Sequence, residues 1–463
     1  MPKYAREQVL IGQMTLSALA LNMNGNSTHG DAVFDSVSTD TRKLREGDLY
    51  IALVGENFDG NQFVGQAWEK GASGAIVSSE QDCELPQLTV VDTQMALGEL
   101  ASLNRQRSEA KLIALTGSQG KTTVKEMIGA ILSVGARTLT TRSNLNNTIG
   151  VPLTLLELTE AHQFAVVEIG ANAPGEIAYC VKLVEPDIAL ITNAAAAHLE
   201  GFGDLHGIVQ AKGEIIDGLK EGGVLLLNAD DKNFASWKLR AGDRKVISFS
   251  GSGEKSADYF AVDIQVMGRE GIAFHLMGPQ SSLDIRLNML GAHNVVNALA
   301  AAALSLEAGA SNDDVIAGLA GLESIKGRMS SLPGVNKTWL IDDTYNASPS
   351  SFRAAIDVLA AFEGRKILVV GDMKELGQET ASAHCEVGKY ARKKQIDDLL
   401  SVGEISHLSS TELGANGKHF PDKEQLVSAC KSIMDTNTAV LVKGSRGAGM
   451  DEVVAGLVAR EGL

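Results

Sequence analysis

The sequence predicts an α/β protein of about three domains, with a parallel β-sheet in the central one. The chain has 463 residues, and a domain takes roughly 150. From residue 111 onwards, short continuous apolar runs alternate with helical segments, a pattern typical of strands covered on both faces. Hydrophobic residues make up 44% of the chain and charged residues 21%, which excludes a disordered chain.

Residues 1–92 are predicted to form a small α/β domain. Strands are expected over residues 48–53 and 75–78, and a helix over 63–70. Glycines and polar residues separate these segments, as they do in turns. A connecting helix is expected over residues 97–107.

Residues 93–323 are predicted to form the central domain. From about residue 259 to 290 apolar and polar residues alternate, which indicates a small antiparallel piece with one face toward solvent. An Ala-rich helix is expected over residues 293–306. The expected buried strands are residues 112–115, 164–169, 188–192 and 224–227.

Residues 324–463 repeat the alternation of strands and helices. This repetition predicts a second βαβ array, separate from the central sheet. The expected strands are residues 339–342, 367–371, 399–402 and 439–442.

The chain is acidic, with a formal net charge of −16. Such a charge argues against non-specific binding of nucleic acid or of anionic membranes. No apolar run approaches the ~20 residues that span a bilayer, and residues 1–7 lack the pattern of a secretory signal. The four cysteines lie far apart, which favours free thiols in a reducing cytoplasm: Cys83, Cys180, Cys385 and Cys430.

A glycine-rich turn at residues 116–123 is the strongest local signal of function. It follows an expected strand and opens a helix expected over residues 124–132. Backbone N–H groups of such a turn bind phosphate oxygens, while Lys121 reaches the β- and γ-phosphates and Thr122 binds Mg²⁺. Leu115 stands where the usual P-loop has its first glycine, so the motif is the shorter G-x-x-G-K-T. The predicted nucleotide-binding residues are Gly117, Ser118, Gln119, Gly120, Lys121, Thr122 and Thr123.

Three more residues are predicted to meet this turn at one edge of the sheet. Glu168 and His198 each follow an expected strand, and ligands of open α/β sheets lie beyond the carboxyl ends of strands. Lys212 lies on a helix soon after His198. Structural alternatives stay open: a helix cap for Glu168, a packing role for His198 and solvation for Lys212. An ammonium cannot ligate Mg²⁺, but a carbamate of Lys212 with CO₂ supplies the anionic oxygen that Mg²⁺ prefers.

Polar turns also follow strands of the C-terminal array. Residues 342–349 join a strand to a helix, and residues 371–377 form a similar acidic turn. Lys443 and Arg446 lie at the end of the last strand. These two cations suit either an anionic ligand facing another domain or a solvated loop.

Taken in order, these motifs resemble the Mur ligase family, the ATP-dependent amide-forming enzymes of peptidoglycan precursor synthesis. The resemblance covers nearly the whole chain. It implies a UDP-binding N-terminal domain, a central ATPase domain, and a Rossmann-like C-terminal domain that binds the incoming amino substrate. The segments that carry it are residues 116–122, 144–152, 168–170, 197–203, 211–214, 293–298, 327–328 and 443–446.

Within the family, the chain is similar to the ligases that add D-alanyl-D-alanine to UDP-N-acetylmuramoyl-tripeptide. Asn61 stands where that branch usually has His, and Ser348 where it often has Asn. The D-N-P-R motif of the ligases that add a diamino acid is absent from the sequence. The third residue of the tripeptide, meso-diaminopimelate or lysine, stays open. The segments similar to this branch are residues 38–42, 58–63, 343–349 and 371–377.

The resemblance implies that the γ-phosphoryl group of ATP passes to the tripeptide carboxylate. The amine of the dipeptide then attacks the acyl-phosphate. One Mg²⁺ is implied on Thr122 and Glu168. A second is implied on Glu168, His198 and carbamylated Lys212. The implied catalytic residues are Lys121, Glu168, His198 and Lys212.

Other binding residues are likewise implied by the resemblance alone. Asn294 and Asn297 are expected near the adenine. Arg328 and Asp343 are expected to contact phosphate and ribose. The remaining expected substrate contacts are Asp40, Thr41, Arg42, Asn144, Asn146, Asn147, Lys443 and Arg446.

Three other interpretations stay open. A P-loop phosphotransferase or nucleotide switch would not need both a carboxylate and an amine for ATP turnover. A folylpolyglutamate synthase-like ligase lacks a UDP-binding module, and the first ninety residues argue against it. A non-catalytic binding protein is disfavoured by the intact set of Lys121, Glu168, His198 and Lys212. We expect small-molecule substrates, no nucleic-acid or membrane partner, and a monomer in the cytoplasm.

Overall fold

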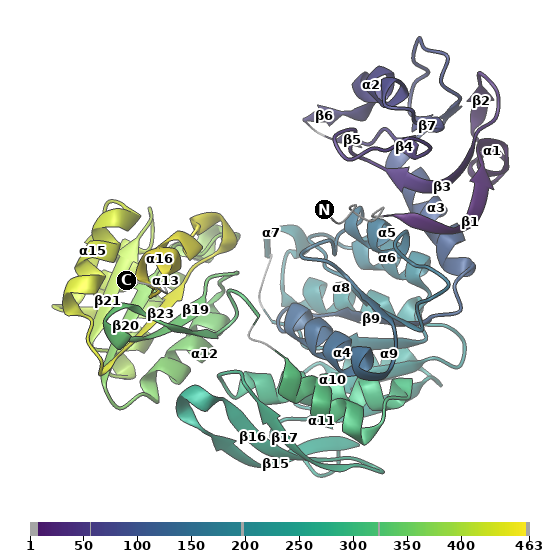
Figure 1. Cartoon of the computed structure of the whole chain (residues 1–463). Helices are drawn as coiled ribbons and strands as arrows, with labels where there is room; N and C mark the ends of the chain where they lie inside the picture. The colour runs from purple at the N-terminus through teal and green to yellow at the C-terminus, as the bar shows by residue number, and fades with distance from the viewer. Residues whose placement is uncertain (1–7, 56, 196–198, 323–324, 460–463) are drawn as a thin grey trace.

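The computed structural model describes residues 8–55, 57–195, 199–322 and 325–459. Three main β-sheets follow one another along the chain (Figure 1). Each sheet carries helices, and the second sheet contains both parallel and antiparallel strands. The structure therefore confirms the predicted α/β class.

The first sheet has six strands in the order β1-β3-β4-β7-β8-β2. Strands β3, β4, β7 and β8 are parallel, and β1 and β2 pair antiparallel at the two edges. Its strands are β1 (Val9–Thr15), β2 (Asn26–Thr28), β3 (Val33–Ser38), β4 (Leu49–Ile51), β7 (Gly74–Val77) and β8 (Gln87–Thr89). Beside them lie α1 (Leu16–Met23), α2 (Val64–Glu69), the turn η1 (Gly60–Phe63) and the hairpin of β5 (Val54–Gly55) and β6 (Phe58–Asp59).

Helix α3 (Thr93–Gln106) connects the first sheet to the second. It begins four residues before the expected start, because the carboxylate of Asp92 accepts hydrogen bonds from the backbone N–H groups of Gln94 and Met95. Such a cap satisfies donors that the first helical turn leaves unpaired.

The second sheet has nine strands in the order β10-β11-β9-β12-β13-β14-β15-β16-β17. The pairs from β10 to β15 are parallel, and β15, β16 and β17 pair antiparallel, which confirms the predicted antiparallel piece. The strands are β9 (Lys111–Thr116), β10 (Thr138–Thr140), β11 (Phe164–Glu168), β12 (Ile188–Ile191), β13 (Val224–Asn228), β14 (Lys245–Ser250), β15 (Tyr259–Val266), β16 (Ile272–Met277) and β17 (Ser282–Leu287).

Helices cover both faces of this sheet. Strand β9 shows why: Leu112 and Ala114 enter one apolar core, whereas Ile113 and Leu115 enter the other, as the two-residue period of a strand requires. On the first face lie α5 (Gly150–Leu155), α6 (Glu176–Val184), α8 (Leu205–Asp217) and α9 (Phe234–Ala241). On the second lie α4 (Lys121–Gly135), α10 (His293–Ala308) and α11 (Asn312–Gly321). The short elements are α7 (Leu199–Phe202) and η2 (Gly268–Glu270).

The third sheet has the order β18-β19-β23-β20-β21-β22, parallel except for β18. One core contains residues of α12 and α13 and another contains residues of α15 and α16, so this sheet is also covered on both faces. The strands are β18 (Ser330–Pro333), β19 (Trp339–Asp343), β20 (Arg365–Val370), β21 (Asp398–Val402), β22 (Gly417–Phe420) and β23 (Thr438–Lys443). The helices are α12 (Pro349–Ala360), α13 (Thr380–Lys393), α14 (His407–Leu413), α15 (Lys423–Ile433) and α16 (Asp451–Leu457), with the turns η3 (Val335–Lys337), η4 (Gly377–Glu379) and η5 (Arg446–Ala448).

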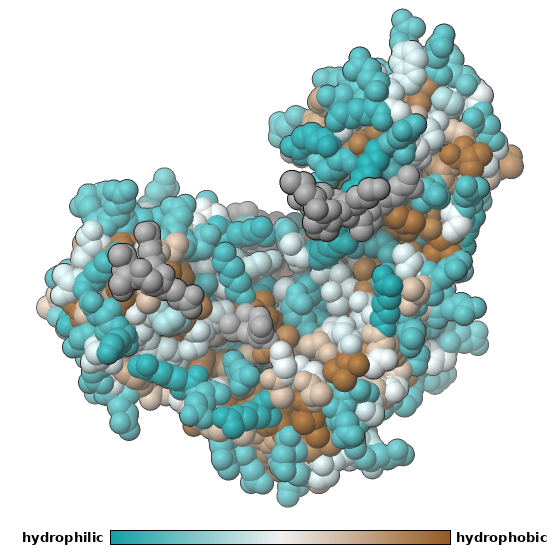
Figure 2. Space-filling model, in the orientation of Figure 1, coloured by the Kyte–Doolittle hydropathy of each residue, from teal (hydrophilic) through white to brown (hydrophobic). Residues whose placement is uncertain are grey.

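The surface in Figure 2 is mostly hydrophilic, with scattered apolar patches. Among the residues described, no helix is both long and apolar enough to cross a membrane. The four cysteines are unpaired, as predicted.

Candidate active site

The glycine-rich turn joins the end of β9 to the start of α4. Helix α4 begins at Lys121, three residues before the expected start, so Lys121 and Thr122 belong to its first turn. Gly117 and Gly120 have φ angles of +148° and +82°, which favour glycine. A Cβ atom on Gly117 would lie 1.9 Å from the hydroxyl of Thr192. The two glycines are therefore required by the backbone itself.

Residues beyond the end of β12 hold this turn from the side. The hydroxyl of Thr192 donates to the carbonyl of Gln119 at 2.6 Å. Asn193 accepts from the backbone N–H groups of Ser118 at 3.0 Å and of Gln119 at 2.9 Å. This support was not predicted from the sequence, although polar residues directly after a neighbouring parallel strand are a usable signal.

Lys121 is the cation of the turn. Its Nζ donates to the carbonyl of Gly117 at 2.6 Å, so the amine lies over the turn. Burial lowers the pKa of Lys121, the negative charge of Glu168 opposes that shift, and the positive charge of Arg328 adds to it. Thr123 also lies in the first turn of α4 and is buried.

Glu168 ends strand β11 and faces the same helix start. Its Oε1 accepts from the amide of Asn146 at 2.8 Å and from the hydroxyl of Thr122 at 3.2 Å. Its Oε2 is buried and makes no hydrogen bond to a described residue. A buried carboxylate oxygen without a donor, next to a hydroxyl, fits a hard cation such as Mg²⁺.

Lys212 lies on α8 with 4% of its surface exposed. Its Nζ lies 5.5 Å from the centre of the Phe202 ring, and no described carboxylate is within ion-pair distance. Burial, followed by the charge of Lys121, lowers the pKa of Lys212 to about 7, while Glu214 and Glu176 oppose the shift. The alternative of a solvated helical lysine is therefore wrong.

His198 falls outside the described residues. Among the residues that are described, no group of three His, Cys, Asp or Glu side chains is arranged to hold a metal ion. Thr122, Glu168 and a modified Lys212 are not such a group, since only one of them belongs to these residue types.

The linker before β18 brings Arg328 to the turn. Nη2 of Arg328 donates to the hydroxyl of Thr122 at 3.0 Å, and Cζ of Arg328 lies 4.1 Å from the centre of the Tyr345 ring. Cζ of Arg446 lies 5.6 Å from the same ring. Two predicted site residues, more than a hundred positions apart, thus share one aromatic side chain.

The start of α10 lies against the turn. The amide of Asn297 donates to Oδ1 of Asn294 at 2.9 Å, and Asn294 donates to the carbonyl of Leu290 at 2.7 Å. A Cβ atom on Gly120 would lie 2.5 Å from Oδ1 of Asn297. Of the two predicted adenine contacts, Asn297 therefore lies beside the glycine-rich turn, and Asn294 is hydrogen-bonded to Asn297.

Helix α12 of the third sheet also reaches the turn. Nε2 of Gln119 donates to the hydroxyl of Ser350, and lies 3.3 Å from the hydroxyl of Ser348, which caps α12. The glycine-rich turn and the start of α4 therefore contact both the linker before β18 and helix α12.

Lys443 and Asp343, two predicted binding residues, are paired with each other. Lys443 is 2% exposed, and its Nζ donates to Oδ2 of Asp343 at 2.6 Å and to the carbonyl of Asn346 at 2.9 Å. Arg446, in contrast, is exposed. Of the two cations at the end of β23, Arg446 is the more available to an anionic ligand.

The acidic turn at residues 371–377 follows β20 and binds the loop that follows β21. The carboxylate of Asp372 accepts from the backbone N–H groups of Glu404 at 2.8 Å, Ile405 at 3.1 Å and Ser406 at 2.8 Å. His384 accepts from the backbone N–H of Met373 at 3.0 Å. This motif therefore fixes the loop between β21 and α14.

The predicted substrate residues of the first sheet are held by their neighbours. Arg42 pairs with Asp40 at 2.8 Å between Nη2 and Oδ2. The hydroxyl of Thr41 donates to Gln66 at 2.5 Å, and Lys70 donates to the carbonyl of Thr41 at 2.6 Å. The side chain of Arg42 is the most exposed of the three predicted residues.

The predicted substrate residues after β10 differ from one another. Asn146 contacts Glu168, as described above. Oδ1 of Asn147 accepts from the backbone N–H of Gly150 at 2.8 Å, at the start of α5. Asn144 is exposed.

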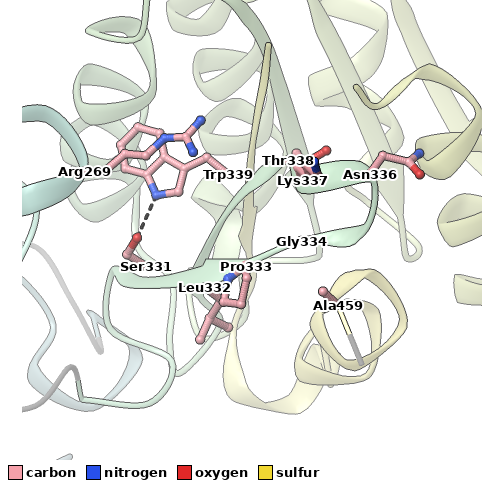
Figure 3. A pocket seen from close by; sticks show the side chains of 10 residues that line it. All are labelled: Arg269, Ser331, Leu332, Pro333, Gly334, Asn336, Lys337, Thr338, Trp339 and Ala459. Atoms are coloured by element: carbon pink, nitrogen blue, oxygen red, sulfur yellow. Dashed lines mark hydrogen bonds between the residues drawn. The ribbon is translucent and has the colours of Figure 1, made fainter. Parts of the chain in front are cut away.

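A cavity of about 600 Å³ lies elsewhere, between the β15–β16 connection and strands β18 and β19 (Figure 3). Arg269 stacks on Trp339 there, with 5.3 Å between Cζ and the ring centre, and Trp339 donates to the hydroxyl of Ser331 at 2.8 Å. The cavity contains none of the predicted site residues. It is lined by Arg269, Ser331, Leu332, Pro333, Gly334, Asn336, Lys337, Thr338, Trp339 and Ala459.

Three family models match the chain, one after another. Residues 33–105 match the Mur ligase family catalytic domain, residues 115–305 the Mur ligase middle domain, and residues 327–446 the Mur ligase glutamate ligase domain. The UDP-N-acetylmuramoyl-tripeptide–D-alanyl-D-alanine ligase of Escherichia coli K12 is 48% identical over 96% of this chain and 98% of its own length.

Solved structures agree in fold over nearly the same length. MurF from Acinetobacter baumannii has a TM-score of 0.90 and 38% identity, covering 96% of this chain and 99% of its own. The MurF ligase of Thermotoga maritima in complex with ADP has a TM-score of 0.81 and 27% identity, covering 91% of this chain and 96% of its own. This chain therefore belongs to the Mur ligase family.

Proposed function

We propose that this chain is an ATP-dependent ligase that joins D-alanyl-D-alanine to UDP-N-acetylmuramoyl-tripeptide, giving the UDP-N-acetylmuramoyl-pentapeptide of peptidoglycan synthesis. The observation that carries the proposal is the meeting of Lys121, Thr122 and the unpartnered Oε2 of Glu168 at one glycine-rich turn. The reaction is that of the relative 48% identical over almost the entire length.

The reaction begins with two anions that repel each other. A carboxylate oxygen of the tripeptide attacks the γ-phosphorus of ATP, and the bond to ADP breaks. The amine of the dipeptide then attacks the carbonyl carbon of the acyl-phosphate, the C–O bond to phosphate breaks, and the amine loses a proton. Lys121 supplies positive charge at the transferring phosphoryl group, and the backbone N–H groups of Gly120, Lys121 and Thr122 bind the phosphates.

The donor set fits a magnesium ion. Thr122 offers a hydroxyl and Glu168 an unpartnered carboxylate oxygen, and hard cations take such oxygen ligands. Bound there, Mg²⁺ neutralises phosphate charge. Asn146 keeps Glu168 oriented through Oε1 and leaves Oε2 for the ion. His198 belongs to the proposed ligands of a second Mg²⁺, together with Glu168 and Lys212.

The proposal includes a carbamate on Lys212. Carbamate formation needs a neutral amine, which adds to the carbon of CO₂ and then releases a proton. The surroundings of Lys212 favour the neutral form, because the side chain is buried and lies near the charge of Lys121. The carbamate is negatively charged, so the positive charge of Lys121 attracts it.

The other binding roles are assigned as follows. Asn294 and Asn297 lie near the adenine, Arg328 contacts a phosphate, and Asp343 contacts the ribose. The first 92 residues bind the UDP part, residues 93–323 bind ATP, and residues 324–463 bind the dipeptide. We propose that the enzyme acts as a cytoplasmic monomer, without a nucleic-acid or membrane partner. The proposed substrate contacts are Asp40, Thr41, Arg42, Asn144, Asn146, Asn147, Lys443 and Arg446.

Phosphate release tests the proposal against a phosphotransferase or a nucleotide switch. ATP and Mg²⁺ are mixed with UDP-tripeptide, with D-alanyl-D-alanine, with both, or with neither. Sustained release only when both are present supports a ligase, because the acyl-phosphate is consumed only by the amine. Equal release without the dipeptide or without the tripeptide would contradict it.

A further inference from the structure

The linker that carries Arg328 is attached to the turn after β19. The backbone N–H of Tyr345 donates to the carbonyl of Gly327 at 3.0 Å, and the backbone N–H of Met329 lies 3.3 Å from Oδ1 of Asp343. Gly327 has a φ of +74°, and a Cβ atom there would lie 3.1 Å from the backbone nitrogen of Tyr345. The linker and this turn therefore form one tightly packed unit.

Arg328 leaves this unit and reaches the central sheet. Its Nη2 donates to the hydroxyl of Thr122 at 3.0 Å, across a separation of 206 residues. Its Nε is buried and makes no hydrogen bond to a described residue. The guanidinium group therefore has an N–H donor without a described partner close to the first turn of α4. Such a group is suited to bind a phosphate oxygen there.

Tyr345 is the side chain that fixes the guanidinium group. The ring centre lies 4.1 Å from Cζ of Arg328, a stacking distance, and 5.6 Å from Cζ of Arg446. The negative face of an aromatic ring attracts both cations and so offsets part of their mutual repulsion. The hydroxyl of Tyr345 makes no hydrogen bond to a described residue, so the ring and not the hydroxyl makes these contacts.

We propose that Tyr345 is a positioning residue that holds the guanidinium of Arg328 at Thr122. An arginine side chain has several rotatable bonds, and ordering it costs conformational entropy. The stack on Tyr345 holds the guanidinium of Arg328 in one orientation before ATP binds. The cation is therefore already in place when the phosphates arrive. The inference rests on the proposed function, because it gives Arg328 a phosphate to contact.

The test uses Tyr345→Leu, which removes the aromatic face, and Tyr345→Phe, which keeps it. Tyr390→Leu is the matched control, because Tyr390 stacks with Arg353 at 5.6 Å in the same part of the chain. Tyr345→Met replaces the leucine variant if that variant does not fold. Each is measured alone and with Arg328→Ala, for kcat, for KM of UDP-tripeptide, and for Kd of a non-hydrolysable ATP analogue.

We expect Tyr345→Leu to lower kcat about tenfold and to raise the Kd of the ATP analogue. The KM of UDP-tripeptide should be unchanged. Tyr345→Phe should stay within about twofold of the parent chain, as should Tyr390→Leu. In the Arg328→Ala background, Tyr345→Leu should have no further effect on either quantity, since Tyr345 acts through Arg328.

The proposal would be overturned if Tyr345→Leu lowered kcat by the same factor in the parent chain and in the Arg328→Ala background. It would also be overturned if Tyr345→Phe were as impaired as Tyr345→Leu. Failure of the proposed function gives a different result. The parent chain would then make no product, while binding of the ATP analogue would still show whether Tyr345 and Arg328 act together.

Discussion

The amide of Asn146 donates a 2.8 Å hydrogen bond to Oε1 of Glu168. The hydroxyl of Thr122 lies 3.2 Å from the same oxygen, and Oε2 is left without a described partner. One oxygen of the carboxylate is therefore held by Asn146 and Thr122, and the other is available to bind a cation. Asn146, expected only as a substrate contact, also orients a candidate metal ligand, as supporting residues do in metal sites.

Glu168→Gln should raise the Mg²⁺ concentration needed for half-maximal ATP turnover by at least about tenfold. The amide keeps the size of the side chain but loses the negative charge that attracts the cation. A magnesium titration of phosphate release measures the shift. Asn146→Ala should give a smaller shift in the same direction. An unchanged magnesium midpoint for Glu168→Gln would remove Glu168 from the metal site.

Lys121→Ala should lower ATP turnover by about a hundredfold or more while the fold is kept, because a charge on the transferring phosphoryl group is lost. Lys220→Ala is the control, since Lys220 lies between α8 and β13 and pairs with Asp187 at 2.9 Å, away from the glycine-rich turn. Initial rates of phosphate release and circular dichroism check the two variants. Near-normal turnover of Lys121→Ala would show that the turn does not act on the phosphates.

Lys212 should carry a carbamate in the active enzyme. Its pKa of about 7 means that the neutral amine increases as pH rises through 7, so at constant dissolved CO₂ the carbamate should increase in that direction. Enzyme equilibrated with ¹³C-labelled CO₂ should show a carbamate carbon signal by NMR. The signal should vanish in Lys212→Ala, which should be nearly inactive and partly restored by short carboxylic acids.

An unmodified ammonium at Lys212 in an active complex with metal would contradict that expectation. So would full activity after CO₂ has been removed from the buffer and the protein.

Asp372→Asn should lower the free energy of unfolding by about 1–3 kcal/mol at pH 7, because an amide cannot accept three backbone N–H groups as the carboxylate does. Burial raises the pKa of Asp372, but the hydrogen bonds from Ser406, Glu404 and Ile405 outweigh it, and the pKa lies below the ordinary 3.8. The stabilisation is therefore complete above pH 3.8 and is lost as pH falls through the folded-state pKa.

Urea unfolding of parent and variant at pH 7, 5 and 3 measures that difference. Glu386→Gln is the control, since Glu386 is exposed and pairs with Arg353 at 3.3 Å. A difference that stays constant down to pH 3 would show that the charge of Asp372 does not stabilise the loop.

Much of the fold could be predicted from sequence, because buried parallel strands are continuous apolar runs. The bounds expected for strands β9, β11, β12 and β13 agree with the structure to within one residue at each end. Short edge strands such as β10, β18 and β22 were missed, since three or four residues carry no clear period. Helix α4 begins earlier than its apolar residues indicate, because Gly120 with its positive φ places Lys121 in the first turn.

The candidate site was predictable where residues are neighbours in sequence and less so where folding brings them together. The glycine-rich turn has a local pattern, whereas the burial of Lys212 depends on how α8 packs, and residue type alone favoured a solvated lysine. The contacts of Arg328 with Thr122 and of Gln119 with Ser350 join distant segments. The pairing of Lys443 with Asp343 likewise leaves no trace in the spacing of the sequence.

The mass of the product shows which amino substrate the enzyme adds. The chain is incubated with ATP and Mg²⁺, in one reaction with UDP-N-acetylmuramoyl-tripeptide and D-alanyl-D-alanine, and in another with UDP-N-acetylmuramoyl-dipeptide and meso-diaminopimelate. We expect a new mass only in the first reaction, equal to the two substrates joined with loss of one water, and one ADP per product. A product only in the second reaction would contradict the proposed function and place the enzyme at the addition of the diamino acid.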